Sequence, residues 1–213
     1  MIASFSRNFI FIKPRKAAGT SLEIVLSAAC SGRDVCTPIS PADEPLRASH
    51  GGRARNHRDW LGRRRFYNHM PAAEVERRLP ELWRSAFRFT VERHPYEKVL
   101  SLAWFRAGPN GGSGKDIAAR IESEIARRDY LNHPLYTIGG RIAVDEVWEY
   151  DRLADHVRSA GERLGLAPDI SLPRAKSGFR KDPRPAAEVL TQGQRRRIRD
   201  DAAFEFELMG YEP

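Results

Sequence analysis

The fold of this chain is constrained most by two short apolar runs. Each run is followed by a turn and then by apolar residues at helical spacing. Residues 9–12 (FIFI) have the composition of a buried strand, and Leu22, Val25 and Leu26 then recur with the period of a helix. Residues 87–91 (FRFTV) alternate as a second strand. Because strands that alternate with helices favour an α/β fold, we expect a three-layer sandwich with a mostly parallel central sheet.

The rest of the chain extends this alternation. Helical spacing recurs in five further segments, which are residues 71–75, 95–104, 116–128, 153–164 and a last region that ends at residue 211. A third strand is expected over residues 142–150. Residues 30–67 and 108–114 are rich in glycine, proline or charge and are expected to be irregular. No internal repeat or domain boundary is visible, which predicts a single domain over residues 1–213.

Composition limits the classes of function that the chain can serve. Its 213 residues include 36 Lys and Arg against 28 Asp and Glu, and the formal net charge of +8 favours anionic partners. Cys30 and Cys36 are too few for a disulfide scaffold and lack the spacing of a zinc site. No run approaches the ~20 apolar residues of a membrane span, and the first apolar run lacks the features of a signal peptide. We therefore expect a cytoplasmic protein without a membrane span.

The first candidate site is the turn between the first strand and its helix, residues 15–21 (RKAAGTS). A helix N-terminus presents unpaired N–H groups and partial positive charge, Gly19 lets the backbone approach an anion, and Lys16 adds a full charge. These features predict a cradle for a phosphate or phosphosulfate. The spacing differs from that of the triphosphate P-loop, in which lysine directly follows glycine. The alternative is that Thr20 and Ser21 only cap the helix.

The second candidate site follows the second strand, where Arg93 stands at the edge of the sheet that binds ligands in α/β folds. Pro95 opens the next helix, and Ser101 lies about two turns into it. The planar fork of arginine suits bidentate contact with a phosphate, so we expect a second phosphate site here. The alternative is a salt bridge from Arg93 to Glu92 or Glu97, with the serine packed against the sheet.

Together the two motifs resemble those of a known family. Residues 16–21 (KAAGTS) after an apolar strand resemble the 5′-phosphosulfate loop of sulfotransferases that use 3′-phosphoadenosine 5′-phosphosulfate (PAPS), in the carbohydrate (Golgi-type and bacterial) branch. Residues 93–101 (RHPYEKVLS) resemble the 3′-phosphate motif of the same family, and the order and separation of the two motifs agree with it. The resemblance extends more weakly over residues 144–211.

The resemblance implies a P-loop-like nucleotide-binding core, with PAPS as co-substrate and 3′-phosphoadenosine 5′-phosphate (PAP) as product. Lys16 would stabilise charge on the leaving 5′-phosphate. The nucleotide-binding residues would be Arg15, Lys16, Gly19, Thr20 and Ser21 at the 5′-phosphate, Arg93 and Ser101 at the 3′-phosphate, and Lys176, Ser177, Arg180 and Lys181 in a basic loop over the nucleotide. Such a loop, residues 174–184, also suits a ligand with several negative charges. A solvated basic loop is the alternative.

The sequence departs from the family pattern at two places. The family usually has His-Ile-Pro-Lys before the glycine, where this chain has residues 13–16 (KPRK). The second motif usually has Asp or Asn after the arginine, where this chain has His94. Neither change removes Lys16 or Arg93, and both bear on the geometry of the loops.

The acceptor hydroxyl needs a general base. Sulfuryl transfer is an in-line displacement that relies on positioning and charge stabilisation, and we expect no metal. Histidine is the usual base near neutral pH. His69 is the first candidate, because it precedes an expected helix where many family members carry a histidine, and His50 is the second. The alternative is a His69 that only caps or packs.

The sequence leaves the acceptor open. Residues 30–67 and 108–114 are the loops expected to shape its pocket, since binding residues concentrate on loops. A carbohydrate or a small molecule with a hydroxyl group fits the resemblance, and nucleic acid is not expected as a partner. The sequence does not define the oligomeric state.

Two other functions compete with the sulfotransferase. The first is an ATP-dependent kinase of the P-loop class, which shares the strand, cradle and helix but needs magnesium and the missing lysine spacing. The second is a module that binds nucleic acid or another polyanion, motivated by the net charge and by the basic runs at residues 53–65 and 195–199. These runs lack interleaved aromatic residues that could stack on bases.

Overall fold

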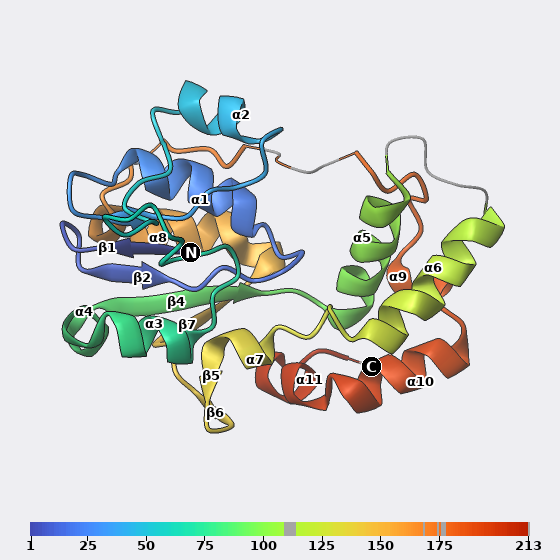
Figure 1. The fold of residues 1–213 in the computed structure, drawn as a ribbon. Coiled ribbons are helices and arrows are strands. Elements are labelled where there is room, and N and C mark those ends of the chain that lie inside the picture. The colour runs from blue at the N-terminus through green and yellow to red at the C-terminus, as the bar shows by residue number, and fades with distance from the viewer. Residues whose placement is uncertain (109–113, 168, 174, 176–177, 213) are drawn as a thin grey trace. The chain divides into compact units, whose positions relative to one another are not determined.

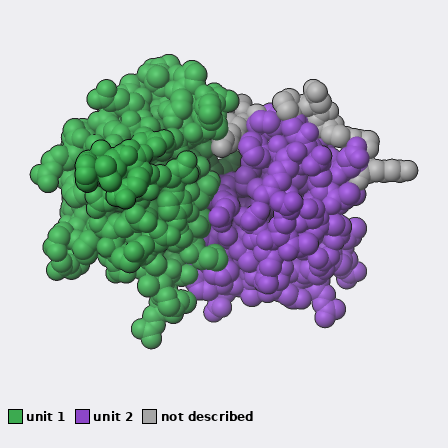
Figure 2. All heavy atoms as spheres, viewed as in Figure 1, with its two compact units in different colours: residues 1–14, 18–91, 134–175 green, residues 15–17, 92–133, 176–213 purple. Residues whose placement is uncertain are grey.

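The structure is a computed structural model that describes residues 1–108, 114–167, 169–173, 175 and 178–212 (Figure 1). The chain divides into two compact units (Figure 2). Unit 1 consists of residues 1–14, 18–91 and 134–175, and unit 2 of residues 15–17, 92–133 and 176–213. The prediction of a single domain stays a prediction.

Unit 1 is built on a five-stranded mixed sheet. Its strands lie in the order β3 (Val35–Cys36), β1 (Ile2–Ser4), β2 (Phe9–Phe11), β4 (Phe87–Glu92) and β7 (Glu146–Glu149). β2 pairs parallel with β4, whereas β1 pairs antiparallel with both β2 and β3. Three of these strands, β2, β3 and β4, therefore run in one direction and β1 runs against them.

Helices cover both faces of this sheet. On one face the Phe89 ring of β4 lies 4.3 Å from the Trp148 ring of β7, and Trp148 stacks at 5.5 Å on His156 of α8 (Leu153–Leu164). On the other face the Arg88 guanidinium lies 5.2 Å from the ring of Trp83 in α4 (Pro80–Ser85). Because neighbouring residues of a strand point to opposite faces, these contacts make three layers, and the expected α/β class is confirmed.

The remaining elements of unit 1 connect and flank the sheet. They are α1 (Gly19–Ala28), α2 (Glu44–Ser49), α3 (Ala72–Arg78), α7 (His133–Tyr136), β5 (Thr137–Ile138), β6 (Arg141–Ile142) and the 3₁₀ helix η1 (Tyr150–Arg152). Two expectations were partly wrong. Residues 30–67 are not wholly irregular, because they contain β3 and α2. The strand expected over residues 142–150 is only β7, since Ile142 belongs to a separate hairpin formed by β5 and β6.

Unit 2 is helical, with α5 (Pro95–Ala107), α6 (Gly114–Arg127), α9 (Ala186–Val189), α10 (Gln192–Asp201) and α11 (Ala203–Met209). In α6, Ile117, Ile121 and Ile125 are buried at a spacing of four residues, which places them on one face. They share a core with the apolar face of α5 and with Ile198 of α10. A capping box starts α10. The helices expected in this region are thus confirmed, and the last one is divided into three.

Among the residues that the structure describes, no helix is long and apolar enough to cross a membrane. The same residues contain no cluster of His, Cys, Asp and Glu side chains suited to a metal ion.

Candidate functional site

The turn after β2 has an unusual backbone. Lys16 and Ala18 have φ angles of 56° and 55°, in the left-handed region that residues other than glycine rarely occupy. Each such residue costs roughly 1 to 2 kcal/mol, so the surrounding contacts must hold the turn in this shape. Left-handed and right-handed residues in succession direct N–H groups toward one point, which is a backbone geometry that binds anions.

Helix α1 begins directly after this turn, and no side chain caps it. Ala18 is its N-cap residue, so the alternative that Thr20 and Ser21 cap the helix is wrong. Both residues are buried in the first turn of the helix. Gly19 has a packing role as well, because a Cβ atom there would lie 2.8 Å from Lys13 Cγ.

A buried amide fixes the backbone just before Lys16. The Asn132 side chain accepts a hydrogen bond from the Arg15 N–H at 2.9 Å and donates one to the Arg15 carbonyl at 3.0 Å. Its amide nitrogen also donates to Glu92 Oε1 at 3.4 Å. Glu92 Oε1 in turn accepts from the Arg93 N–H at 2.8 Å. One chain of hydrogen bonds therefore joins the backbones of the two motifs that the sequence singles out.

Buried charges support this chain of hydrogen bonds. Lys98 Nζ lies 2.6 Å from Glu92 Oε1 and 3.9 Å from Glu205 Oε1, and all three side chains are fully buried. His133 Nδ1 donates to Glu205 Oε2 at 3.1 Å. Burial alone would raise the pKa of Glu205, but the hydrogen bond from His133 and the charge of Lys98 outweigh it and lower that pKa. Removing any one partner would leave a buried charge uncompensated, so the network holds its members firmly.

Glu97, in the first turn of α5, gathers two of the predicted phosphate ligands. Its Oε2 accepts from Arg93 Nη2 at 3.1 Å and from Arg180 Nη1 at 2.6 Å. Its Oε1 accepts from the Ala186 N–H at 3.0 Å. The salt bridge considered as an alternative for Arg93 is thus present. An arginine has five N–H donors, so such a bridge and a phosphate contact are compatible.

One face of α5 links these arginines to Lys16. Glu97, Ser101 and Phe105 follow one another at intervals of four residues and so lie on the same face. At the far end Lys16 Nζ lies 4.2 Å from the centre of the Phe105 ring. The Phe105 ring also makes an edge contact, at 5.2 Å, with Phe179 of the basic loop. Eight residues of helix separate the ends of this row by about 12 Å, with the Ser101 hydroxyl between them.

His94 explains one departure from the family pattern. It is the N-cap residue of α5, and its Nδ1 accepts a hydrogen bond from the Tyr96 N–H at 3.3 Å. Asp and Asn are the usual residues for this task, so the imidazole replaces them. Its Nε2–H donates to the Glu212 carbonyl at 3.1 Å, which fixes the tautomer. His94 therefore has a structural role at the start of the second motif.

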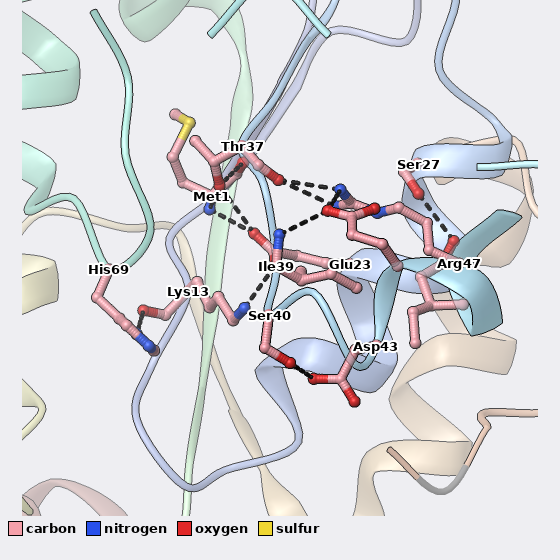
Figure 3. Close-up of polar contacts among 12 residues, drawn as sticks. Met1, Lys13, Glu23, Ser27, Thr37, Ile39, Ser40, Asp43, Arg47 and His69 are labelled. Atoms are coloured by element: carbon pink, nitrogen blue, oxygen red, sulfur yellow. Dashed lines mark hydrogen bonds and ion pairs between the residues drawn. The ribbon is translucent and has the colours of Figure 1, made fainter. Parts of the chain in front are cut away.

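His69 and Lys13 lie together in unit 1 (Figure 3). His69 has a φ angle of 56°, and its Nδ1 lies 3.2 Å from the Lys13 carbonyl. Because a carbonyl only accepts, Nδ1 donates this hydrogen bond, which orients the imidazole ring. The Lys13 ammonium is buried and lies 2.6 Å from Glu23 Oε2. Lys13, which belongs to the departure at residues 13–16, thus serves the packing of α1 on the sheet.

The other basic and histidine candidates are more exposed. His50 is exposed, and its Nδ1 lies 2.9 Å from the Leu46 carbonyl, at the end of α2. In the basic run of α10, Arg195, Arg196 and Arg199 line a shallow hollow of unit 2 beside Tyr96. Among the described residues that line this hollow, Tyr96 is the one aromatic residue. The hollow therefore lacks the several aromatic rings on which bases could stack.

The structure brings some predicted residues together and not others. In unit 2, Lys16, Arg93, Ser101 and Arg180 border one face of α5, and the Arg15 backbone is fixed beside them. Lys181 is exposed, and Lys176 and Ser177 lie outside the described residues. Gly19, Thr20, Ser21 and His69 belong to unit 1.

Two residues that carry the arrangement, Asn132 and Phe105, were missed from sequence, whereas Glu97 was named only as a salt-bridge partner of Arg93. Asn132 lies far from both motifs, and an isolated Asn gives no signal in a single sequence. Phe105 could have been found, because it follows Ser101 at the four-residue spacing of a helix face.

The chain matches no family model, no curated protein and no solved structure.

Proposed function

We propose that the chain is a PAPS-dependent sulfotransferase, which moves the sulfuryl group of PAPS to a hydroxyl of an acceptor such as a carbohydrate or a small molecule. The observation that carries this proposal is the row of groups along α5 in unit 2. Arg93 and Arg180 stand at one end of the row, Ser101 in the middle and Lys16 at the other end. Two separate cationic ends suit a ligand with two anionic groups, such as a nucleotide with 3′ and 5′ phosphates.

The residues present fit such a nucleotide. Arg93 and Arg180 are proposed to hold the 3′-phosphate, with the Ser101 hydroxyl as a further donor. The left-handed turn and the α1 N-terminus supply backbone N–H groups for the 5′-phosphate, in a P-loop-like manner. The hydroxyls of Thr20 and Ser21, in the first turn of α1, are proposed as donors to the same phosphate.

The proposed chemistry is an in-line transfer. The bond between sulfur and the oxygen of the 5′-phosphate breaks, and a bond between sulfur and the acceptor oxygen forms. Lys16 stabilises the negative charge that develops on the leaving oxygen. His69 is the proposed general base for the proton of the acceptor hydroxyl, and the hydrogen bond from its Nδ1 to the Lys13 carbonyl orients the ring.

Calorimetric titration with PAP, ATP and AMP in EDTA tests the proposal. We expect tight binding of PAP without metal, a clear preference for PAP over AMP, and a loss of about tenfold to a hundredfold with Arg93→Ala, since one charge-assisted hydrogen bond contributes roughly 1.5 to 3 kcal/mol. Lys16→Ala should abolish sulfuryl transfer to a test acceptor.

Arg195→Ala is the matched control, because it removes an arginine of the same unit from α10 and not from the α5 row. It should leave PAP binding unchanged. Binding of ATP only with magnesium, or no selectivity for the 3′-phosphate, would refute the proposal and favour the kinase.

A further inference from the structure

Residues 57–66 of unit 1 form a hairpin with a firmly built turn. Arg58 and Arg64 pair as an antiparallel bridge. At the tip, the Asp59 N–H donates to the Arg63 carbonyl and the Gly62 N–H to the Asp59 carbonyl, both at 2.9 Å. Gly62 has a φ angle of 76°, which the turn requires and glycine readily adopts. Asp59 Oδ1 also accepts from the Arg63 N–H at 2.9 Å, so the tip is a defined structure.

The base of the hairpin is anchored to the unit. Arg55, just before it, exchanges two backbone hydrogen bonds of 3.0 Å with Cys36 of β3, at the edge of the sheet. Phe66, which ends it, is 1% exposed. The hairpin is therefore held at its base.

The tip carries two adjacent apolar side chains in solvent. Trp60 is 89% exposed and Leu61 is 53% exposed. The other three tryptophans of the chain, Trp83, Trp104 and Trp148, are buried. A defined turn that presents a tryptophan and a leucine to water indicates a surface that binds something.

Cations surround this apolar tip. Residues 58–65 contain one acidic residue, Asp59, and four exposed arginines, which are Arg58, Arg63, Arg64 and Arg65. The net charge of this segment is therefore +3. Tryptophan favours the interfacial region of a bilayer because its ring is apolar and its N–H polar, and arginine favours the anionic headgroups above it. A polysaccharide or nucleic acid could stack on the ring face and pair with the cations, but it would not bury the leucine side chain beside them.

We propose that the hairpin of residues 57–66 docks the protein onto an anionic lipid bilayer. Trp60 and Leu61 enter the interfacial region, and Arg58 and Arg64 contact lipid phosphates. The contact is peripheral and reversible, since a few side chains on one turn contribute far less than a spanning helix. This docking does not depend on the proposed sulfotransferase activity.

Vesicle binding tests the proposal. Full-length protein should co-sediment with vesicles of phosphatidylcholine and phosphatidylglycerol and not with phosphatidylcholine alone. Because the other tryptophans are buried, Trp60 should dominate a blue shift of the fluorescence on binding and its quenching by brominated lipid. The double variant W60A/L61S should bind about tenfold or more weakly. Arg58→Ser and Arg64→Ser should each lose about fivefold at low salt.

The β5–β6 hairpin supplies a matched control. The double variant R141S/I142A changes an exposed arginine and an exposed isoleucine on another hairpin of the same unit, and it should bind as the wild type does. Circular dichroism should show both double variants folded. No binding to anionic vesicles, or equal binding by W60A/L61S, would overturn the proposal. It would also be overturned if Trp60 were needed for binding heparin or DNA and not for binding vesicles.

Discussion

In the proposed nucleotide site, replacing Asn132 with alanine should weaken binding of the 5′-phosphate and leave binding of the 3′-phosphate nearly unchanged. The substitution leaves the N–H and the carbonyl of Arg15 without their partner. A buried polar group without a partner costs about 1 to 3 kcal/mol, so the free energy of unfolding should fall by roughly 2 to 4 kcal/mol. It also releases Arg15 and Lys16, and re-ordering a residue costs about 1 to 2 kcal/mol of backbone entropy.

These magnitudes predict a selective loss of affinity. In the proposed site PAP needs the turn ordered, so its binding should weaken by about tenfold to a few hundredfold. In the proposed site, 3′-AMP would contact Arg93, Ser101 and Arg180 but not the turn, so its binding should change by less than about threefold. Calorimetric titration of both nucleotides, beside urea unfolding of the same samples, measures the two effects separately.

Tyr130→Phe is the matched control. Tyr130 is also buried in unit 2, and its hydroxyl donates to Asp201 at 3.1 Å. This variant should lose stability and keep the affinities for both nucleotides. The positioning role of Asn132 is wrong if the folded N132A variant binds PAP as the wild type does, or if its affinities for PAP and 3′-AMP fall by the same factor.

Three further predictions concern single side chains. His94→Ala should lower the free energy of unfolding by about 1 kcal/mol, and His94→Asn should restore it, as measured by urea denaturation. Glu97→Ala should speed tryptic cleavage after Lys181 by about tenfold, because Arg180 and the following segment lose an anchor; cleavage at the wild-type rate would contradict that role. Burial would raise the pKa of Glu23, but Lys13 and the Met1 amine lower it from 4.5 to about 2. A carboxyl with a depressed pKa stabilises the fold above about pH 4.5, and about 3 kcal/mol should be lost as the pH falls toward 2. Glu23→Gln should be less stable at neutral pH and lack this dependence in urea titrations between these pH values.

Much of the fold could be predicted because periodicity reports burial directly. The strand at residues 9–12 and the helix at residues 153–164 follow from the spacing of apolar residues, and Gly165 marks the end of that helix with a left-handed cap. β1 was missed because its three residues carry no pattern of their own. The turn after it is held in part by Asp34, about thirty residues away, which accepts hydrogen bonds from the Phe5 and Ser6 N–H groups.

In the candidate site, too, residues in local motifs could be predicted and residues that make long-range contacts could not. Lys16 and Arg93 could be proposed because each belongs to a local motif with a physical reason for its spacing. Asn132 could not, since it joins Arg15 to Glu92 and lies more than a hundred residues along the chain from Arg15. Contacts between distant segments leave no trace in one sequence, and a buried asparagine looks like any exposed one until the fold is known.

The division of the chain into two units has a consequence for how such a protein can change over time. The backbone passes from one unit to the other five times, and residues 15–17, with Lys16, are a short excursion that interrupts unit 1. No continuous stretch of the chain encodes either unit whole. Exchange of one continuous gene segment therefore cannot replace a whole unit, whereas substitutions and loop insertions can change either unit in place.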